Sequence, residues 1–167
     1  MQRMLPMRLK VCSIIHKPYP MMTNFVHYLI NETSHTIIGL DSLSYAGNLE
    51  NLSQLESESR FTFVKIDTRD MDALEAALFD KVSIDYVIHF AAESHVDRSI
   101  MDSTAFIETN VLGTQILLDL SRKYHIKRYL QVSTDEVYGS LGKEGSFTEN
   151  TPLSPNSPYS ASKAAAD

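Results

Sequence analysis

The chain has 167 residues, which is enough for one domain with a substantial hydrophobic core. Hydrophobic residues make up 43% of it and charged residues 22%, as is ordinary for a soluble globular protein. The formal net charge of −6, without a dense basic patch, argues against nucleic acid or an anionic membrane as the main partner. With one cysteine and no long apolar segment, neither an internal disulfide nor a membrane span is expected, and a cytoplasmic location is predicted.

Short apolar segments alternate with helical patterns along the chain. The segments are nearly continuous apolar runs, typical of parallel strands that are covered on both faces. Residues 24–32, 71–81 and about 103–123 carry apolar side chains at helical spacing, and Asp70 is an expected N-cap. This order predicts an α/β fold with a Rossmann-like, doubly wound parallel sheet. The expected strands are residues 9–15, 35–41, 60–67, 85–92 and 127–134.

Ligands of such sheets bind beyond the carboxyl ends of the strands, so the residues that follow each strand are informative. Asp41 ends the second strand, where an acid can bind both ribose hydroxyls of NAD and repel a 2′-phosphate. Because aspartate commonly ends strands, this signal is weak alone. Ala91 and Ala92 after the fourth strand either admit a flat ring close to the backbone or simply pack near a helix.

The fifth strand is followed by Thr134, Asp135 and Glu136. Two adjacent carboxyl groups can share acid and base chemistry when the charge of one keeps the other protonated. The alternative is a solvated acidic turn without a chemical role. Residues 140–158 then form a polar loop rich in Pro, Gly and Ser, and a loop of that length is usually functional.

Tyr159 and Lys163 are four residues apart, so on a helix they share one face and the lysine lies beneath the tyrosine ring. A nearby ammonium group favours the phenolate and lowers the pKa of tyrosine from about 10. The phenolate can then remove a proton from a substrate hydroxyl while hydride leaves the same carbon. This spacing often arises by chance, but here it follows a five-strand Rossmann-like pattern.

Four segments resemble the extended short-chain dehydrogenase/reductase family, and within it the dTDP-glucose 4,6-dehydratases. They are HFAAESHVDRSI (89–100), FIETNVLGT (106–114), VSTDEVYGS (132–140) and NSPYSASKAAAD (156–167). The similarity extends from about Thr23 to Asp167. The Asp-Glu pair after the strand-end threonine is the specific part, since related sugar-nucleotide epimerases share Tyr-x-x-x-Lys and usually lack the pair.

The resemblance implies a three-stage dehydration of dTDP-glucose with NAD as a bound shuttle. Tyr159, helped by Lys163 and Thr134, would deprotonate the C4 hydroxyl while hydride passes to NAD. Glu136 would remove the C5 proton as Asp135 protonates the departing C6 hydroxyl, and hydride would return to C6. The same resemblance implies a sugar-nucleotide contact from Ser94 and a cofactor site that includes Tyr159 and Lys163 with Asp41, Ser42, Leu43, Ser44, Asp67, Thr68, Phe90, Ala91, Ala92 and Thr109. The six histidines and one cysteine show no metal-ligand spacing, so no metal is expected.

Two departures from the family pattern weaken the expectation of activity. The family's Gly-Gly-x-Gly-x-x-Gly turn, which meets the cofactor pyrophosphate, corresponds here to HKPYPMM (16–22). Side chains at every glycine position block close approach of the backbone, and Pro18 and Pro20 remove amide donors. NAD is therefore expected to bind poorly.

The second departure is at Asp167, where the family continues with further strands and a smaller domain that clasps the nucleotide. Residues 1–167 are therefore interpreted as an incomplete, truncated NAD(P)-binding Rossmann-like domain without the C-terminal substrate domain. The family's homodimer is expected to be weakened or lost. The alternatives to an impaired dehydratase are a non-catalytic Rossmann fragment or partner subunit, and an epimerase or decarboxylase of sugar nucleotides, against which the Asp135–Glu136 pair counts.

Overall fold

The structure is a computed structural model that describes residues 10–15, 20–44 and 49–167. Five parallel strands form one sheet in the order β3-β2-β1-β4-β5. The order runs outward from β1 in both directions, which is the arrangement of a doubly wound sheet and confirms the predicted fold class. The strands are β1 (Lys10–Ile15), β2 (Thr36–Asp41), β3 (Phe61–Lys65), β4 (Tyr86–His89) and β5 (Arg128–Gln131).

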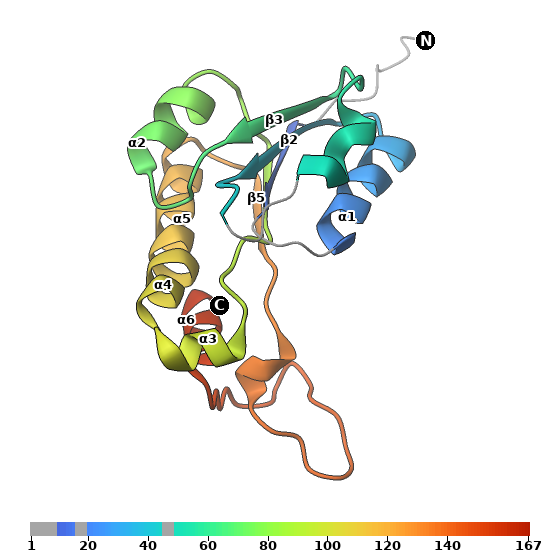
Figure 1. Cartoon of the computed structure of the whole chain (residues 1–167). Coiled ribbons are helices and arrows are strands. Elements are labelled where there is room, and N and C mark those ends of the chain that lie inside the picture. Colours follow the sequence, from blue (N-terminus) through green and yellow to red (C-terminus); the bar gives the residue numbers. More distant parts are fainter. Residues whose placement is uncertain (1–9, 16–19, 45–48) are drawn as a thin grey trace.

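Helices cover both faces of the sheet (Figure 1). One hydrophobic core lies between the sheet and α1 (Pro20–Glu32) with η1 (Leu49–Leu55). A second core lies between the sheet and η2 (Glu75–Phe79) with α5 (Gly113–Lys123). Among the described residues, no helix has the length and hydrophobicity to cross a bilayer. The helices are α1 (Pro20–Glu32), η1 (Leu49–Leu55), α2 (Met71–Leu74), η2 (Glu75–Phe79), α3 (Val96–Met101), α4 (Thr104–Phe106), η3 (Ile107–Leu112), α5 (Gly113–Lys123), η4 (Asp135–Tyr138) and α6 (Pro158–Ala166).

The expected helices are confirmed, with differences in local geometry. Asp70 caps α2 as predicted, since its carboxylate accepts a hydrogen bond from the Ala73 amide at 2.9 Å. The helices expected over residues 71–81 and 103–123 each contain a π-helical segment, η2 and η3, where the turns are wider. Apolar spacing alone does not distinguish such turns from regular α-helix.

The segment expected to replace the glycine-rich turn falls mostly outside the described part of the structure. Residues 16–19 of HKPYPMM are not described, while α1 begins at Pro20. Proline is well suited to a first helical position, because the N–H that it lacks would have no intrahelical acceptor there.

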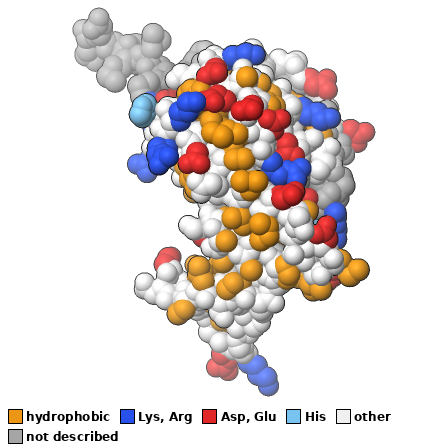
Figure 2. Space-filling model, turned by 90° about the vertical axis from the view of Figure 1, so that its left-hand side faces the viewer, with side chains coloured by type: hydrophobic (Ala, Val, Ile, Leu, Met, Phe, Trp, Pro, Cys, Tyr) orange, Lys and Arg blue, Asp and Glu red, His pale blue; other side chains and the backbone are white. Residues whose placement is uncertain are grey.

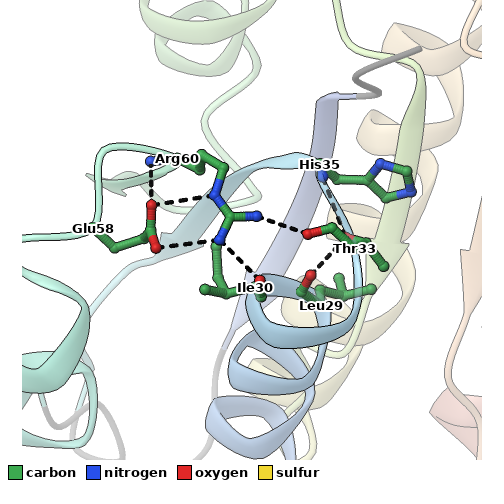
Figure 3. Close-up of polar contacts among 6 residues, drawn as sticks. All are labelled: Leu29, Ile30, Thr33, His35, Glu58 and Arg60. Carbon is green, nitrogen blue, oxygen red and sulfur yellow. Dashed lines mark hydrogen bonds and ion pairs between the residues drawn. The ribbon is translucent and has the colours of Figure 1, made fainter. Parts of the chain in front are cut away.

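Arg60 caps the C-terminus of α1 from a distant segment of the chain (Figure 3). Its guanidinium donates to the carbonyl oxygens of Thr33 at 2.7 Å and Ile30 at 2.9 Å, while Glu58 binds its other side. The last turn of α1 contains no basic residue of its own. Arg60 therefore supplies both the donors and the positive charge that a helix C-terminus favours.

Candidate active site

An open cleft lies at the carboxyl ends of β2, β3 and β4, with an empty volume of about 520 Å³. This is the edge of the sheet where a doubly wound fold binds its ligands. The structure brings together here six residues of the expected cofactor site, Ser42, Ser44, Asp67, Thr68, Ala91 and Thr109. Three further residues line the cleft without having been expected, Arg69, Glu93 and Ala105.

Asp41 organises the turn that leads from β2 into the cleft. Its carboxylate accepts a hydrogen bond from the Leu43 amide at 2.7 Å, and it is only 3% exposed. Leu43 has a φ of +52°, an unfavourable conformation for a side chain of its size, so the carboxylate helps to hold a strained turn. Asp41 and Leu43 therefore shape the cleft without being among its lining residues.

Three other expected ligand residues also lie outside the cleft lining. Phe90 packs against Phe25 of α1, with ring centroids 5.3 Å apart, and belongs to the core beneath α1. Ala92 is buried, and Ser94 is half-buried after the loop that follows β4. The apolar character of Phe90 explains its place in the core.

The outer wall of the cleft is a chain of ion pairs. Arg69 donates from Nε and Nη2 to the two carboxylate oxygens of Asp67, at 3.0 and 2.8 Å. Its Nη1 donates to Glu108 of η3 at 2.8 Å. The side chains of all three residues are between 34% and 49% exposed, so water screens these interactions.

Thr134, Asp135 and Glu136 form a compact acidic corner after β5. Thr134 is the N-cap of η4, and its hydroxyl accepts a hydrogen bond from the Glu136 amide at 3.4 Å. Asp135 is exposed, and Glu136 is half-buried. The carboxyl groups are thus in the first turn of a short helix, at the end that favours negative charge.

Helix α6 brings Tyr159 and Lys163 to this corner. A capping box between Ser157 and Ser160 starts the helix, and Tyr159 and Lys163 are 6% and 2% exposed. The Lys163 ammonium donates to the carbonyl oxygen of Val132 at 2.7 Å. Ser133 donates to Asp167 at 2.6 Å, so two hydrogen bonds fix α6 against the segment that follows β5.

The pKa of the Tyr159 hydroxyl contradicts one expectation. Burial raises it above its ordinary value of 10.0, a hydrogen bond with Thr134 lowers it, and the charges of Glu136 and Asp135 raise it. The expected lowering by Lys163 does not appear, because the ammonium binds the Val132 carbonyl and is not among the groups that shift the pKa of Tyr159. The dependence on Thr134, Asp135 and Glu136 nevertheless places the hydroxyl among those three groups.

Asn110 is a further polar residue that sequence reasoning missed. It is 1% exposed in η3, and its side chain bonds to Glu93 beside the cleft and to Ser162 of α6. An asparagine between buried positions of an otherwise apolar helical pattern was the available signal. Among the described residues, no group of three or more His, Cys, Asp or Glu side chains is arranged to hold a metal ion.

Solved structures with this arrangement belong to nucleotide-sugar enzymes. DesIV from Streptomyces venezuelae, a dTDP-glucose 4,6-dehydratase with NAD bound, matches with a TM-score of 0.87 and 43% identity over 95% of this chain and 49% of that one. A dTDP-glucose 4,6-dehydratase from Bacillus anthracis in complex with NAD has a TM-score of 0.82 and 42% identity, covering 95% and 48% of the two chains.

Sequence relatives agree with this likeness. A dTDP-glucose 4,6-dehydratase of Xanthomonas campestris pv. campestris is 53% identical over an alignment of 140 residues that covers 78% of this chain and 40% of the relative. The low-salt glycan biosynthesis protein Agl12 of Haloferax volcanii is 46% identical over 145 residues, 87% of this chain and 46% of the relative. The chain thus spans about half the length of these relatives. A family model described as GDP-mannose 4,6 dehydratase matches residues 23–167, and the chain belongs to that family.

Proposed function

We propose that this chain carries the catalytic corner of an NAD-dependent dTDP-glucose 4,6-dehydratase. The observation that carries the proposal is the grouping of one buried tyrosine hydroxyl with a threonine and two carboxyl groups, Thr134, Asp135 and Glu136. Dehydration across C5 and C6 needs an acid and a base, and oxidation at C4 needs a second base. Several relatives that are 43–53% identical to this chain carry that name.

The described cleft fits the adenosine half of NAD. Asp41 is at the end of β2, where an acid can meet the ribose hydroxyls, and Ser42, Asp67 and Thr68 add polar groups around the cleft. Ala91 leaves room beside the strand end. When bound, NAD supplies reversible acceptance of hydride, so that the overall reaction involves no net oxidation.

The residues of the acidic corner and of α6 carry out the proton transfers of the proposed reaction. Tyr159 takes the proton of the sugar C4 hydroxyl as C4 becomes a ketone, and Lys163 holds the tyrosine helix through the Val132 carbonyl. The C4 ketone acidifies the neighbouring C5–H bond, and Glu136 removes that proton. Asp135 protonates the C6 hydroxyl so that it departs as water and leaves a C5–C6 double bond. Return of hydride to C6 and of a proton to C5 then gives the 4-keto-6-deoxy sugar.

We propose that two features lower the NAD affinity and activity of this chain relative to those of its relatives. In HKPYPMM, four positions that would be glycine in the family pattern are His16, Lys17, Tyr19 and Met22. We therefore propose weak NAD binding. We also propose that residues 1–167 correspond to an incomplete NAD(P)-binding domain, with the substrate-binding domain in the part of the relatives that this chain does not match.

We propose that the family's homodimer is weakened or lost in this chain, although an apolar surface suited to another chain is present. Figure 2 shows hydrophobic side chains in a band down the face formed by the helices, and Ile100, Met101, Ile107, Leu112 and Leu118 are each at least 41% exposed. Exposed apolar groups in such a band are typical of a surface that meets another chain. Light scattering across a range of protein concentrations tests this proposal, and a stable dimer at every concentration would overturn it.

The reaction is tested by incubating dTDP-glucose, saturating NAD and the protein in D₂O, and following the product by mass spectrometry and NMR. We expect the product to have lost one water and to have gained one deuteron at C5, because C5 is reprotonated from the solvent. Glu136→Gln should abolish the deuteration at C5, whereas Asp135→Asn should retain exchange at C5 and slow the loss of water. A product that keeps its C6 hydroxyl and differs only at C4 would indicate an epimerase instead.

A further inference from the structure

Asp67 and Arg69, which follow β3, line two pockets at once. One is the cleft described above, with an empty volume of about 520 Å³. The other is an outer pocket with an empty volume of about 1080 Å³, which they line together with Glu108 and Leu112. The two residues therefore form a wall that borders open space on both sides, and one of those sides is the interior of the cleft.

The hydrogen bonds of Arg69 hold this wall flat. Its Nε and Nη2 bind the two carboxylate oxygens of Asp67, and its backbone amide donates to Oδ1 of Asp67 at 2.9 Å. Its Nη1 binds Glu108, so three of the five guanidinium N–H groups are engaged. Because these N–H bonds lie in the guanidinium plane, the carboxylates occupy its edge. A ligand in the cleft therefore meets the face of the guanidinium.

The rest of the cleft lining favours a flat, uncharged ring. Ala91 and Ala105 contribute only methyl groups, and no aromatic side chain is present among the described lining residues. The pair of Arg69 and Asp67 is thus the flat surface that this lining offers for stacking. The two acids Asp67 and Glu93 outnumber the one arginine, so a phosphate group is disfavoured in this part of the cleft.

We propose that Arg69 is a specificity-determining residue, whose guanidinium, held flat by Asp67, stacks on the purine ring of a bound adenosine. A guanidinium is planar and weakly hydrated, so it stacks on aromatic rings in a way that an ammonium does not. The two fused rings of a purine cover more of the planar pair than the single ring of a pyrimidine. The benefit to the enzyme rests on the proposed function, in which the cleft receives the adenosine half of NAD.

The proposal is tested by titrating the full chain with adenosine and with uridine, while NMR follows the amide signals of residues 67–69 and 105–109. The two nucleosides share their ribose and carry no phosphate, so the replaced glycine-rich turn does not enter the comparison. The unaltered chain should bind adenosine about tenfold more tightly than uridine. Arg69→Ala should weaken adenosine binding by about tenfold and change uridine binding by less than about twofold.

Two further variants separate stacking from charge. Arg69→Lys keeps the positive charge and lacks a flat surface, so it should lose the preference for adenosine as Arg69→Ala does. Glu108→Gln is the matched control, because Glu108 lines the outer pocket and not the cleft, and glutamine still accepts a hydrogen bond. This control should keep the preference. The side chain of Arg69 is 41% exposed, so its replacement leaves the hydrophobic core intact.

Several results would overturn the proposal. They are equal affinity of the unaltered chain for the two nucleosides, binding of neither, a preference that survives in Arg69→Ala or Arg69→Lys, and a preference that is lost as fully in Glu108→Gln. Failure of the proposed function is a different result. A preference for adenosine that depends on Arg69, in a chain that neither binds NAD nor dehydrates dTDP-glucose, would support the role of Arg69 and remove the proposed reaction.

Discussion

The charged side chains of the outer cleft wall are partly exposed to water, whereas Tyr159 and Lys163 in the corner after β5 are buried. Asp67, Arg69 and Glu108 form ion pairs whose side chains are 34–49% exposed. In the corner, Tyr159 and Lys163 are at most 6% exposed. Exposed pairs are screened and exchange easily with ligand groups, whereas buried polar groups are costly to displace. The cleft wall is thus suited to admit a ligand, and the corner is suited to hold reacting groups still.

The largest expected effect is on the corner. Tyr159→Phe should lower kcat by about 10²- to 10⁴-fold, because it removes the proposed base and retains the ring that packs against Phe106. The free energy of unfolding should fall by no more than about 1.5 kcal/mol. Activity and chemical denaturation are measured on the same preparation, and a variant within tenfold of the original kcat would remove Tyr159 from the mechanism.

The contact between η3–α5 and the cleft wall should show the next largest effect. A Cβ added at Gly113 would lie 2.7 Å from the Thr68 hydroxyl oxygen, so Thr68 must move. Gly113→Ala should cost about 1–3 kcal/mol of stability and weaken NAD binding. Gly142→Ala is the matched control, because a Cβ there meets nothing within 4 Å. Equal effects of the two substitutions would contradict close packing of Thr68.

The corner should also respond to alkaline pH. Because burial raises the pKa of Tyr159 above 10.0, its contribution to stability is fully present below that value and is lost as the pH rises above it. The stability difference between the chain and Tyr159→Phe should therefore shrink from about pH 9 to about pH 11. A difference that grows over this range would mean that the phenolate, and not the phenol, is favoured in the folded chain.

The smallest effect is expected on the cleft wall. Arg69→Ala and Glu108→Gln should each change the free energy of unfolding by less than about 1 kcal/mol, and added salt should reduce the difference further. A double-mutant cycle between the two positions measures their coupling. A coupling energy as large as that of a buried network would remove the contrast between the two regions.

The strands of the sheet and most of the polar residues that line the cleft could be predicted from the sequence. Continuous apolar runs predicted the five strands, and the family resemblance supplied Ser42, Asp67, Thr68, Ala91 and Thr109, which line the cleft. The spacing of residues in the sequence could not show which partner a polar side chain binds. Lys163 shares a face with Tyr159, yet its ammonium binds a carbonyl of the neighbouring segment.

The different place of Phe90 and the omission of Asn110 have the same physical origin. Phe90 follows a strand as a ligand residue would, but its apolar ring is more stable against Phe25 in the core. Asn110 depends on partners that are 17 and 52 residues away, and on a π-helical turn that apolar periodicity does not reveal. Long-range hydrogen bonds are decided by packing, so they become visible only in three dimensions.

The most direct test of the account is calorimetric titration with NAD of two proteins, the unaltered chain and a variant with glycine at His16, Lys17, Tyr19 and Met22. The account predicts a Kd of about 1 mM or weaker for the unaltered chain. The variant should bind about 10- to 100-fold more tightly, since each charge-assisted hydrogen bond from a backbone amide contributes about 1.5–3 kcal/mol. Tight binding by the unaltered chain, or no gain in the variant, would contradict the account.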